Sequence, residues 1–233
     1  MTRLDMAYAV GKFSRFVNPI LIIMRCLRVL AATKDHGFFF DRMKAETMAT
    51  SITIEGFCDA DWANCPHTWK GISGFVLSIG GGPVFWSARR QSFVAQSTAE
   101  AEYVAACEAC MEGRELVNKI YVQFNLGIDS QSASVLAANP TYSRRTRQIE
   151  LRFHFVRDQV MKSQMKLWKV LGTNNPADIL TKPLALERFA ALKTKLGMLP
   201  KIASTPRQIN RKAFFSGRSK FAESLKETKV PKQ

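Results

Sequence analysis

The stretch that most constrains the fold is residues 51–63, SITIEGFCDADWA. Its residues alternate between two unlike faces, with Ile52 and Cys58 on one face and Phe57 and Asp59 on the other. A period of two is typical of a β-strand. The strand ends in Asp-Ala-Asp-Trp, so it presents carboxylates where it runs out. Because ligands of open α/β sheets bind outside the carboxyl ends of the strands, we expect Asp59 to belong to a functional site.

The net charge of +15 and the isoelectric point near 9.9 indicate a polyanionic partner, nucleic acid before membrane. A basic surface without such a partner is the alternative. Apolar residues make up 46% of the 233 residues, which is enough for the core of one medium domain with appendages. Five cysteines without a framework spacing favour free thiols in a reducing compartment, and so an intracellular protein in the cytoplasm or the nucleus.

The apolar stretch 16–32 is the only candidate for membrane contact that the pattern offers. Arg25 and Arg28 interrupt it, and it is too short to span a bilayer. We therefore expect no membrane partner, and an amphipathic helix in its place. A second helix is expected before Pro19, so two helices precede the first strand.

Two alternating runs, 75–79 and 84–88, flank a glycine-rich turn and predict a β-hairpin. With the first strand they make a meander of three consecutive strands. A fourth alternating run, 122–128, ends on Asp129, and a fifth strand is expected at 166–171. Because a strand–helix–strand crossover usually places its strands in parallel, Asp59 and Asp129 are expected at the same edge of the sheet.

Helical patterns fill the segments between and after these strands. Ser97 and Glu100 have the spacing of a capping box, which opens a long helix. Further helices are expected at 131–138, at 144–162, and from 174 through 192, where Pro176 lies in the first turn.

Five segments, each weak alone, occur together in one order: FCDADWA (57–63), STAEAEY (97–103), DSQSA (129–133), RTRQIELRFHFVR (145–157) and ADILTKPL (177–184). Together they resemble the ribonuclease H domain at the end of the Pol polyprotein of copia-type retrotransposons. The resemblance implies an α/β fold, a ribonuclease H-like mixed five-stranded sheet with helices on both faces. It also implies an organisation in which 51–198 is the ribonuclease H-like domain.

The resemblance extends to the N-terminal segment. Residues 2–16 are similar to the segment just downstream of the reverse transcriptase core in the same polyproteins, so 1–50 is expected to be a remnant of the reverse transcriptase C-terminal region with two helices. The paired aspartates of the polymerase are absent, so no polymerase activity is expected. Residues 199–233 are rich in Lys, Arg and Ser, which predicts a basic, disordered tail.

The family's four acidic residues fall on Asp59, Glu102, Asp129 and Asp178. The resemblance implies that they are catalytic and hold two Mg²⁺ ions, with Mn²⁺ as an alternative. Two such ions about 3.5–4 Å apart can clamp the attacking and leaving oxygens of an in-line displacement.

Each of these acidic residues has a structural alternative. Glu100 is explained by the capping box, which favours Glu102 as the ligand. Asp178 lies in the first turn of a helix, where any acid is stabilised by the dipole. Asp129 can be a turn residue, and Asp61 a loop carboxylate.

The resemblance implies metal-dependent endonucleolytic hydrolysis of the RNA strand of RNA–DNA hybrids. A basic cluster would bind the nucleic acid through Arg144, Arg145, Arg147 and Arg152. The reverse transcriptase portion of the polyprotein is a second expected partner. The alternative is a catalytically inactive remnant that binds nucleic acid through its basic surface. It rests on the abrupt N-terminus and on the short join at 118–121, which would displace Asp129.

Overall fold

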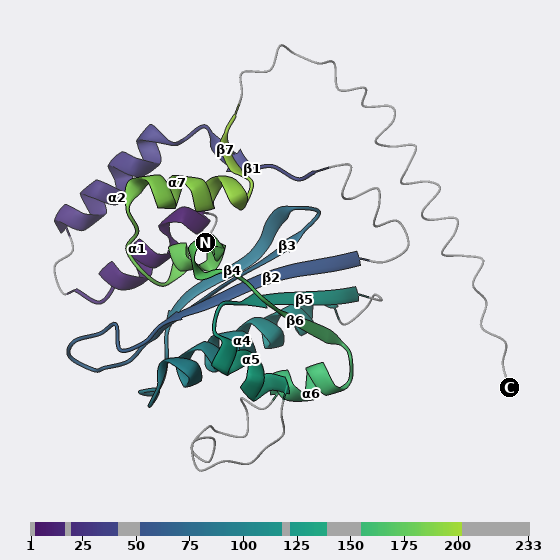
Figure 1. The fold of residues 1–233 in the computed structure, drawn as a ribbon. Coiled ribbons are helices and arrows are strands. Elements are labelled where there is room, and N and C mark those ends of the chain that lie inside the picture. The colour runs from purple at the N-terminus through teal and green to yellow at the C-terminus, as the bar shows by residue number, and fades with distance from the viewer. Residues whose placement is uncertain (1–2, 17–19, 42–51, 118–121, 139–154, 202–233) are drawn as a thin grey trace, which may run out of the picture. The chain divides into compact units, whose positions relative to one another are not determined.

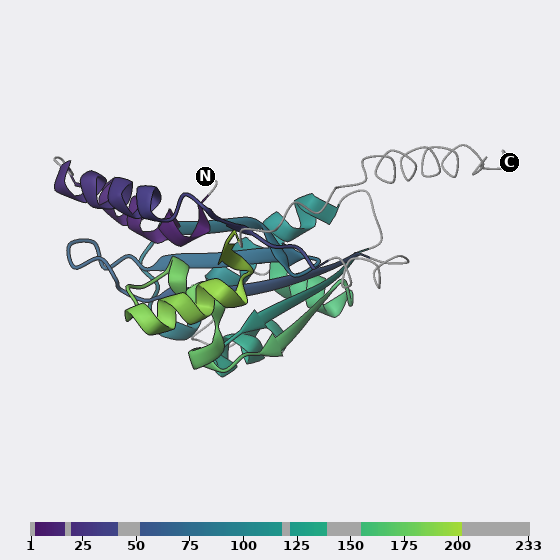
Figure 2. The same ribbon diagram turned by 90° about the horizontal axis from the view of Figure 1, so that it is seen from above.

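The five-stranded sheet is built from two kinds of strand pairing (Figure 1). Strands β2 (Ile52–Asp61), β3 (Ile72–Ile79) and β4 (Gly82–Arg90) form the antiparallel meander predicted from their alternation. Strands β5 (Val122–Ile128) and β6 (Met165–Lys169) run parallel to β2, giving the order β4-β3-β2-β5-β6. The predicted mixed sheet is therefore confirmed. Figure 2 shows how its strands twist relative to one another.

The structure is a computed structural model of the chain and describes residues 3–16, 20–41, 52–117, 122–138 and 155–201. Residues Met1–Pro200 form one compact unit. The predicted disorder of the tail and most of the predicted helix 144–162 lie outside the described residues. Of that helix, the structure contains α6 (Phe155–Met161).

The two faces of the sheet carry different cores, as the period of two requires. One face packs on α4 (Thr98–Val117), α5 (Gln131–Ala138) and α6, with the side chains of Ile54, Leu77 and Leu126 pointing into that core. The opposite face holds Val76 and packs on η1 (Leu4–Met6), α1 (Ala7–Phe13), η4 (Pro176–Leu180) and α7 (Leu186–Lys195). The prediction of helices on both faces is confirmed.

The N-terminal segment also contacts the end of the unit. Strand β1 (His36–Phe38) pairs antiparallel with β7 (Met198–Pro200) in a second, two-stranded sheet. Between α1 and β1, α2 (Ile20–Ala32) has no buried residue. The predicted domain boundary at residues 50 and 51 stays a prediction, and β7 includes two residues that the sequence assigned to the tail. Within the described part of the chain, no helix combines the length and the apolar character needed to cross a membrane.

The prediction of one helix from residue 174 through 192 is wrong. The structure has two separate elements, the 3-10 helix η4 and the α-helix α7, joined by residues 181–185. Pro183 supplies the reason, because it lacks an N–H and its ring disfavours the helical conformation of the residue before it. The break matters because both elements contribute side chains to the site described below.

Candidate active site

The register of the sheet opens a gap between β2 and β5. The pairing of β2 with β5 ends at Phe57 and Gly127, whereas its pairing with β3 continues to Asp61. Asp59 is therefore still in a strand but lies beyond the last pair with β5. Asp129 follows β5 directly, so the two carboxylates face each other where the parallel strands separate. This is the kind of switch point at which α/β sheets bind ligands.

A third carboxylate reaches the same place from η4. Asn175, the N-cap of η4, is fully buried, and its side chain is hydrogen-bonded on both sides. Its side-chain oxygen accepts from the N–H of Ala177 at 3.1 Å, and its Nδ2 donates to the carbonyl of Cys58 at 2.8 Å. Asn175 therefore ties the start of η4 to the residue before Asp59, which places Asp178 beside that strand.

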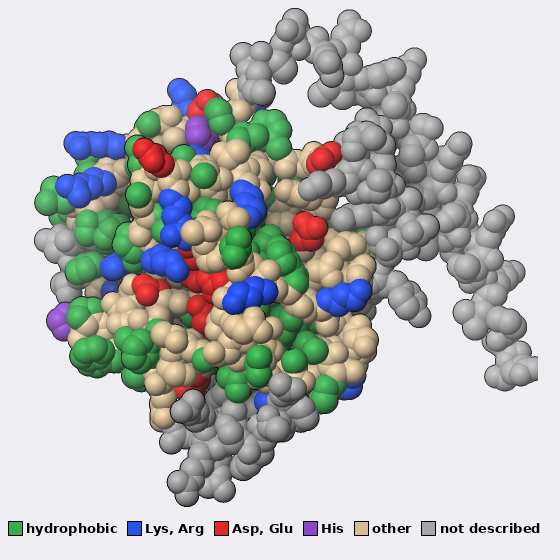
Figure 3. Space-filling view, in the orientation of Figure 1, with side chains coloured by type: hydrophobic (Ala, Val, Ile, Leu, Met, Phe, Trp, Pro, Cys, Tyr) green, Lys and Arg blue, Asp and Glu red, His purple; other side chains and the backbone are tan. Residues whose placement is uncertain are grey.

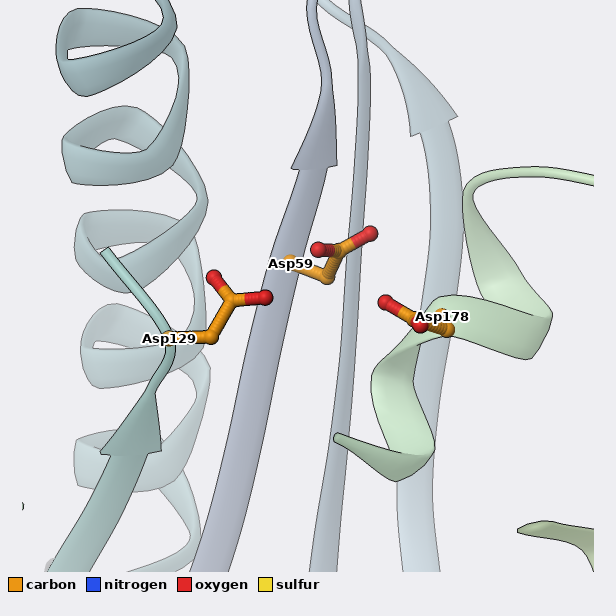
Figure 4. A group of neighbouring side chains, drawn as sticks. All are labelled: Asp59, Asp129 and Asp178. Carbon is orange, nitrogen blue, oxygen red and sulfur yellow. The ribbon is translucent and has the colours of Figure 1, made fainter. Parts of the chain in front are cut away.

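Asp59, Asp129 and Asp178 converge, with one carboxylate oxygen of each within 4.8 Å of the others. Figure 4 shows the three side chains pointing toward one another from β2, from the end of β5 and from η4. Asp59 and Asp178 are buried, and Asp129 is half-buried. The short join at 118–121 lies outside the described residues, but the displacement of Asp129 that it was expected to cause is not found.

Glu102 lies beside this group rather than within it. It is on α4, it is 8% exposed, and its Oε2 is buried without a hydrogen-bond partner among the described residues. Burial, together with the charges of Asp59 and Asp129, raises the pKa of Glu102 to about 9. The carboxylate of Glu102 is therefore close enough to Asp59 and Asp129 to be repelled by the charges of both.

Glu100 has the capping role that the sequence predicted. Its backbone N–H donates to Ser97 Oγ at 3.2 Å, and its Oε2 accepts from the N–H of Gln96 at 2.7 Å. Asp61, the last residue of β2, accepts a hydrogen bond from the side chain of Asn64. The four predicted arginines, Arg144, Arg145, Arg147 and Arg152, lie outside the described residues.

Two cations that the sequence analysis did not select contact the aspartates. Lys182 Nζ lies 2.9 Å from Asp178 Oδ1 and 3.3 Å from Asp59 Oδ2. Arg188, on α7, forms an ion pair with Asp178 Oδ2, and its Nη2 also donates to the carbonyl of Gly172 at 2.8 Å. Figure 3 shows acidic side chains on this face with Lys and Arg side chains around them.

A signal for Lys182 was present, because it follows Asp178 by four residues inside the segment ADILTKPL. The same segment supplies Thr181, whose Oγ1 donates a hydrogen bond to Asp59 Oδ2. No local pattern could have revealed Arg188, because only the turn at Pro183 brings α7 back toward η4.

The sequence is similar to long polyproteins of mobile elements. It is 30% identical over 210 residues to the retrovirus-related Pol polyprotein from transposon RE2 of Arabidopsis thaliana, a match that covers 85% of this chain and 14% of that protein. It is 34% identical over 212 residues to the Pol polyprotein from transposon TNT 1-94 of Nicotiana tabacum, covering 84% of this chain and 15% of that protein. The homologues of this chain are copia-type Pol polyproteins. The chain spans only about a seventh of the length of these relatives.

Solved structures show a more distant likeness to this Pol chain. RNase H1 from the halophilic archaeon Halobacterium salinarum NRC-1 is 17% identical, with a TM-score of 0.42 and coverage of 55% of this chain and 94% of that one. No protein-family model matches the sequence. The order β4-β3-β2-β5-β6, with helices on both faces, agrees with the ribonuclease H-like mixed sheet that the sequence predicted.

The carboxylates of the Pol chain fit divalent cations. They offer only oxygen atoms, which Mg²⁺ and other hard cations prefer. Burial raises the pKa of Asp178 to about 6, and the charge of Asp59 contributes. Burial and Asp59 also raise the pKa of Asp129. Together with the buried, unpartnered Oε2 of Glu102, these shifts indicate negative charge in excess of what Lys182 and Arg188 neutralise.

This excess charge predicts how the stability of the metal-free Pol chain depends on pH. Glu102, Asp129 and Asp178 have pKa values that are raised on folding, so the folded state binds more protons than the unfolded state from about pH 4 to about pH 9. Stability must therefore fall as the pH rises through this window. The pKa of Lys182 is also raised, so its contribution is full below its unfolded value, about 10.4, and stays constant here.

We expect the midpoint of thermal unfolding in EDTA to fall by at least about 5 °C between pH 5 and pH 9. Differential scanning calorimetry at several pH values measures this directly. Glu102→Gln should flatten the decline, because it removes the group whose pKa is raised most. Saturating Mg²⁺ should flatten it as well. A midpoint that rises over the same range would contradict the excess of buried negative charge.

Proposed function

We propose that this chain hydrolyses phosphodiester bonds in the RNA strand of RNA–DNA hybrids, leaving a 3′-hydroxyl and a 5′-phosphate. The observation that carries the proposal is the convergence of Asp59, Asp129 and Asp178 within 4.8 Å, at the point where two parallel strands separate. Glu102 adds a fourth carboxylate beside them. The similarity to Pol polyproteins supports a nuclease of the ribonuclease H type over other functions of these carboxylates.

We propose that these four residues hold two Mg²⁺ ions, or Mn²⁺ in their place. When bound, such ions polarise the phosphate and activate water as the nucleophile. The four carboxylates come from β2, from α4, from the end of β5 and from η4. A well-formed site therefore requires the complete fold.

Neighbouring side chains hold two of the proposed metal ligands, Asp59 and Asp178, in place. Thr181 donates to Asp59, and Arg188 holds Asp178 by its second oxygen. Asn175 anchors the helix from which Asp178 projects. Because Asp59 and Asp178 are held by these partners before substrate arrives, they need little reorganisation when the phosphate binds.

The charge of the chain supports a nucleic acid substrate. The net charge of +15 favours association with a phosphate backbone, and that association should weaken steeply with salt. We propose RNA–DNA hybrid as the substrate and the reverse transcriptase portion of a Pol polyprotein as a further partner. Both proposals follow from the family, in which this chain corresponds to a small part of a longer protein.

The test is cleavage of an end-labelled RNA strand, supplied single-stranded, in duplex RNA, and in an RNA–DNA hybrid. We expect cleavage of the hybrid in Mg²⁺ and none in EDTA. Asp129→Asn should lower the rate by at least about a hundredfold, because a ligand is lost from the half-buried side of the site. The products, resolved on a sequencing gel, should end in a 3′-hydroxyl.

Asp158→Asn is the matched control. Asp158 is an aspartate on α6 whose carboxylate is paired with Lys162 at 2.8 Å and is exposed to solvent. The Asp158→Asn variant should cleave the hybrid at the rate of the parent. Salt-sensitive binding of the hybrid without any metal-dependent cleavage would instead favour the inactive, nucleic-acid-binding remnant.

A further inference from the structure

Lys182 occupies the space between two of the proposed metal ligands. Its ammonium group lies 2.9 Å from Asp178 Oδ1 and 3.3 Å from Asp59 Oδ2, so one cation bridges the two carboxylates. Both carboxylates have side chains that are 1% exposed, whereas the side chain of Lys182 is 33% exposed. The lysine thus enters the carboxylate group from the solvent side and has a route by which to leave it.

A divalent cation shared by Asp59 and Asp178 would need the same space. Mg²⁺ binds carboxylate oxygens at about 2.0–2.1 Å, so an ion held by both aspartates would lie against the ammonium group. Two positive charges at that separation repel strongly in a partly buried site. Lys182 and the metal ion therefore compete for the same oxygens.

Arg188 differs from Lys182 in this respect. Among the carboxylates of the described residues it is paired with Asp178 and not with Asp59, and its Nη2 also donates to the carbonyl of Gly172. It pairs with Asp178 Oδ2, whereas Lys182 lies 2.9 Å from Asp178 Oδ1. Arg188 can keep this contact while Oδ1 takes another partner, so Lys182 is the cation that must move.

The backbone around Lys182 suits such a movement. Lys182 is outside both η4 and α7, in the connection 181–185, and Pro183 follows it. The side chain is a flexible four-carbon stem that carries a point charge, in contrast to the planar fork of an arginine. It can swing away without disturbing a helix, while the neighbouring Thr181 keeps its hydrogen bond to Asp59.

We propose that Lys182 is an internal counter-ion that holds Asp59 and Asp178 together in the metal-free protein and is displaced when a divalent cation binds. The inference rests on the proposed function, because it takes these aspartates as metal ligands. Lys182 is a positioning residue here. It lowers the affinity of the site for metal, and the carboxylates it bridges are kept at binding distance from each other until metal arrives.

The first test measures Mn²⁺ affinity by isothermal titration calorimetry on the full chain, without nucleic acid. Lys182→Gln removes the competing charge and should bind Mn²⁺ about tenfold more tightly than the parent. The matched control is Lys162→Gln, which removes a lysine from an exposed pair with Asp158 at the same spacing of four residues. It should bind Mn²⁺ as the parent does. In EDTA, Lys182→Gln should also unfold at a lower temperature than the parent.

The second test uses the parent protein and does not depend on how a variant folds. Lysine acylation by a small activated ester, followed by peptide mass spectrometry, gives the rate at which each amine reacts. Lys182 should react slowly in EDTA and at least about fivefold faster in saturating Mn²⁺, because displacement exposes the amine. Lys162 should react at one rate in both conditions.

These results separate the two proposals. If the parent binds Mn²⁺ but Lys182→Gln binds it no more tightly, or Lys182 reacts equally with and without Mn²⁺, the counter-ion role is overturned and the proposed function stands. If neither the parent nor the variant binds Mn²⁺, both proposals are overturned.

Discussion

Replacing Asp59 by asparagine is expected to lower the rate of hybrid cleavage by at least about a thousandfold, the scale found when a group essential to an active site is removed. Asp59 is the centre of the carboxylate group. Its charge contributes to the raised pKa values of Glu102, Asp129 and Asp178, so it is electrostatically close to all three. An asparagine keeps the shape and one oxygen acceptor but loses the charge that a divalent cation needs.

The same substitution should leave the fold intact. The hydrogen bond from Thr181 can be accepted by the amide oxygen of an asparagine, and the loss of one charge relieves repulsion from Glu102 and Asp178. We therefore expect a parent-like circular dichroism spectrum. Loss of cleavage with an unfolded variant would not support the assignment, so the spectrum is measured on the same preparation.

Asp61→Asn is the matched control for this experiment. Asp61 is an aspartate two residues farther along the same strand, and its carboxylate is bonded to Asn64. The variant should retain a cleavage rate within about threefold of the parent's, since substitutions away from the core and from buried charge networks have small effects on stability. If instead Asp61→Asn were inactive and Asp59→Asn active, the proposed metal site would have to be moved along β2.

Replacing Gly74 by alanine should lower the free energy of unfolding. Gly74 is paired with Asp59 across β2 and β3, and η4 packs directly on it. A Cβ at this position would lie 2.6 Å from Thr181 Cγ2 and 2.7 Å from Leu180 Cβ. Neither neighbour can yield easily, because Leu180 and Thr181 are themselves buried. Overpacking of this kind costs about 1–3 kcal/mol of unfolding free energy.

The Gly74 substitution should also impair the site. The added methyl group would push η4 away from the sheet, and with it Asp178 and Thr181. A displacement of about 1 Å at a catalytic centre can cost about a hundredfold in rate. Chemical denaturation and hybrid cleavage would be measured on the same variant. We expect both to fall together.

Gly37→Ala is the matched control, because a Cβ at Gly37 would meet nothing within 4 Å. Gly37 is also in a strand, so the two variants differ mainly in the atoms that the added Cβ would contact. Gly37→Ala should change stability by less than about 0.5 kcal/mol. Equal stabilities of the two variants would mean that η4 does not pack against β3 as described.

Much of the sheet could be predicted from the sequence because its signals are local. The alternation at 122–128 and the helical run 131–138 match β5 and α5 at both ends. The capping box at Ser97 marks the start of α4, which begins at Thr98. Parallel pairing of β2 and β5 followed from the crossover rule, which depends only on the order of the elements.

The connection after η4 could not be predicted as easily. The apolar spacing from 174 through 192 is compatible with one helix, and periodicity cannot distinguish that helix from two shorter ones. Pro183 was the available signal, because the residue before a proline is driven out of the helical region.

Residue patterns along the chain suffice to locate the strands in the sequence and the aspartates at their ends, since side-chain period and element order are properties of the chain. How these aspartates meet depends on tertiary contacts. Asn175 bonds to the carbonyl of Cys58, 117 residues earlier, and Gly74 leaves the room that η4 needs. Arg188 reaches Asp178 because the chain turns at Pro183, and Lys182 reaches Asp59, 123 residues earlier in the chain. Contacts of this kind join residues far apart in the chain, and they arise only when burial of both faces of the sheet brings those residues together.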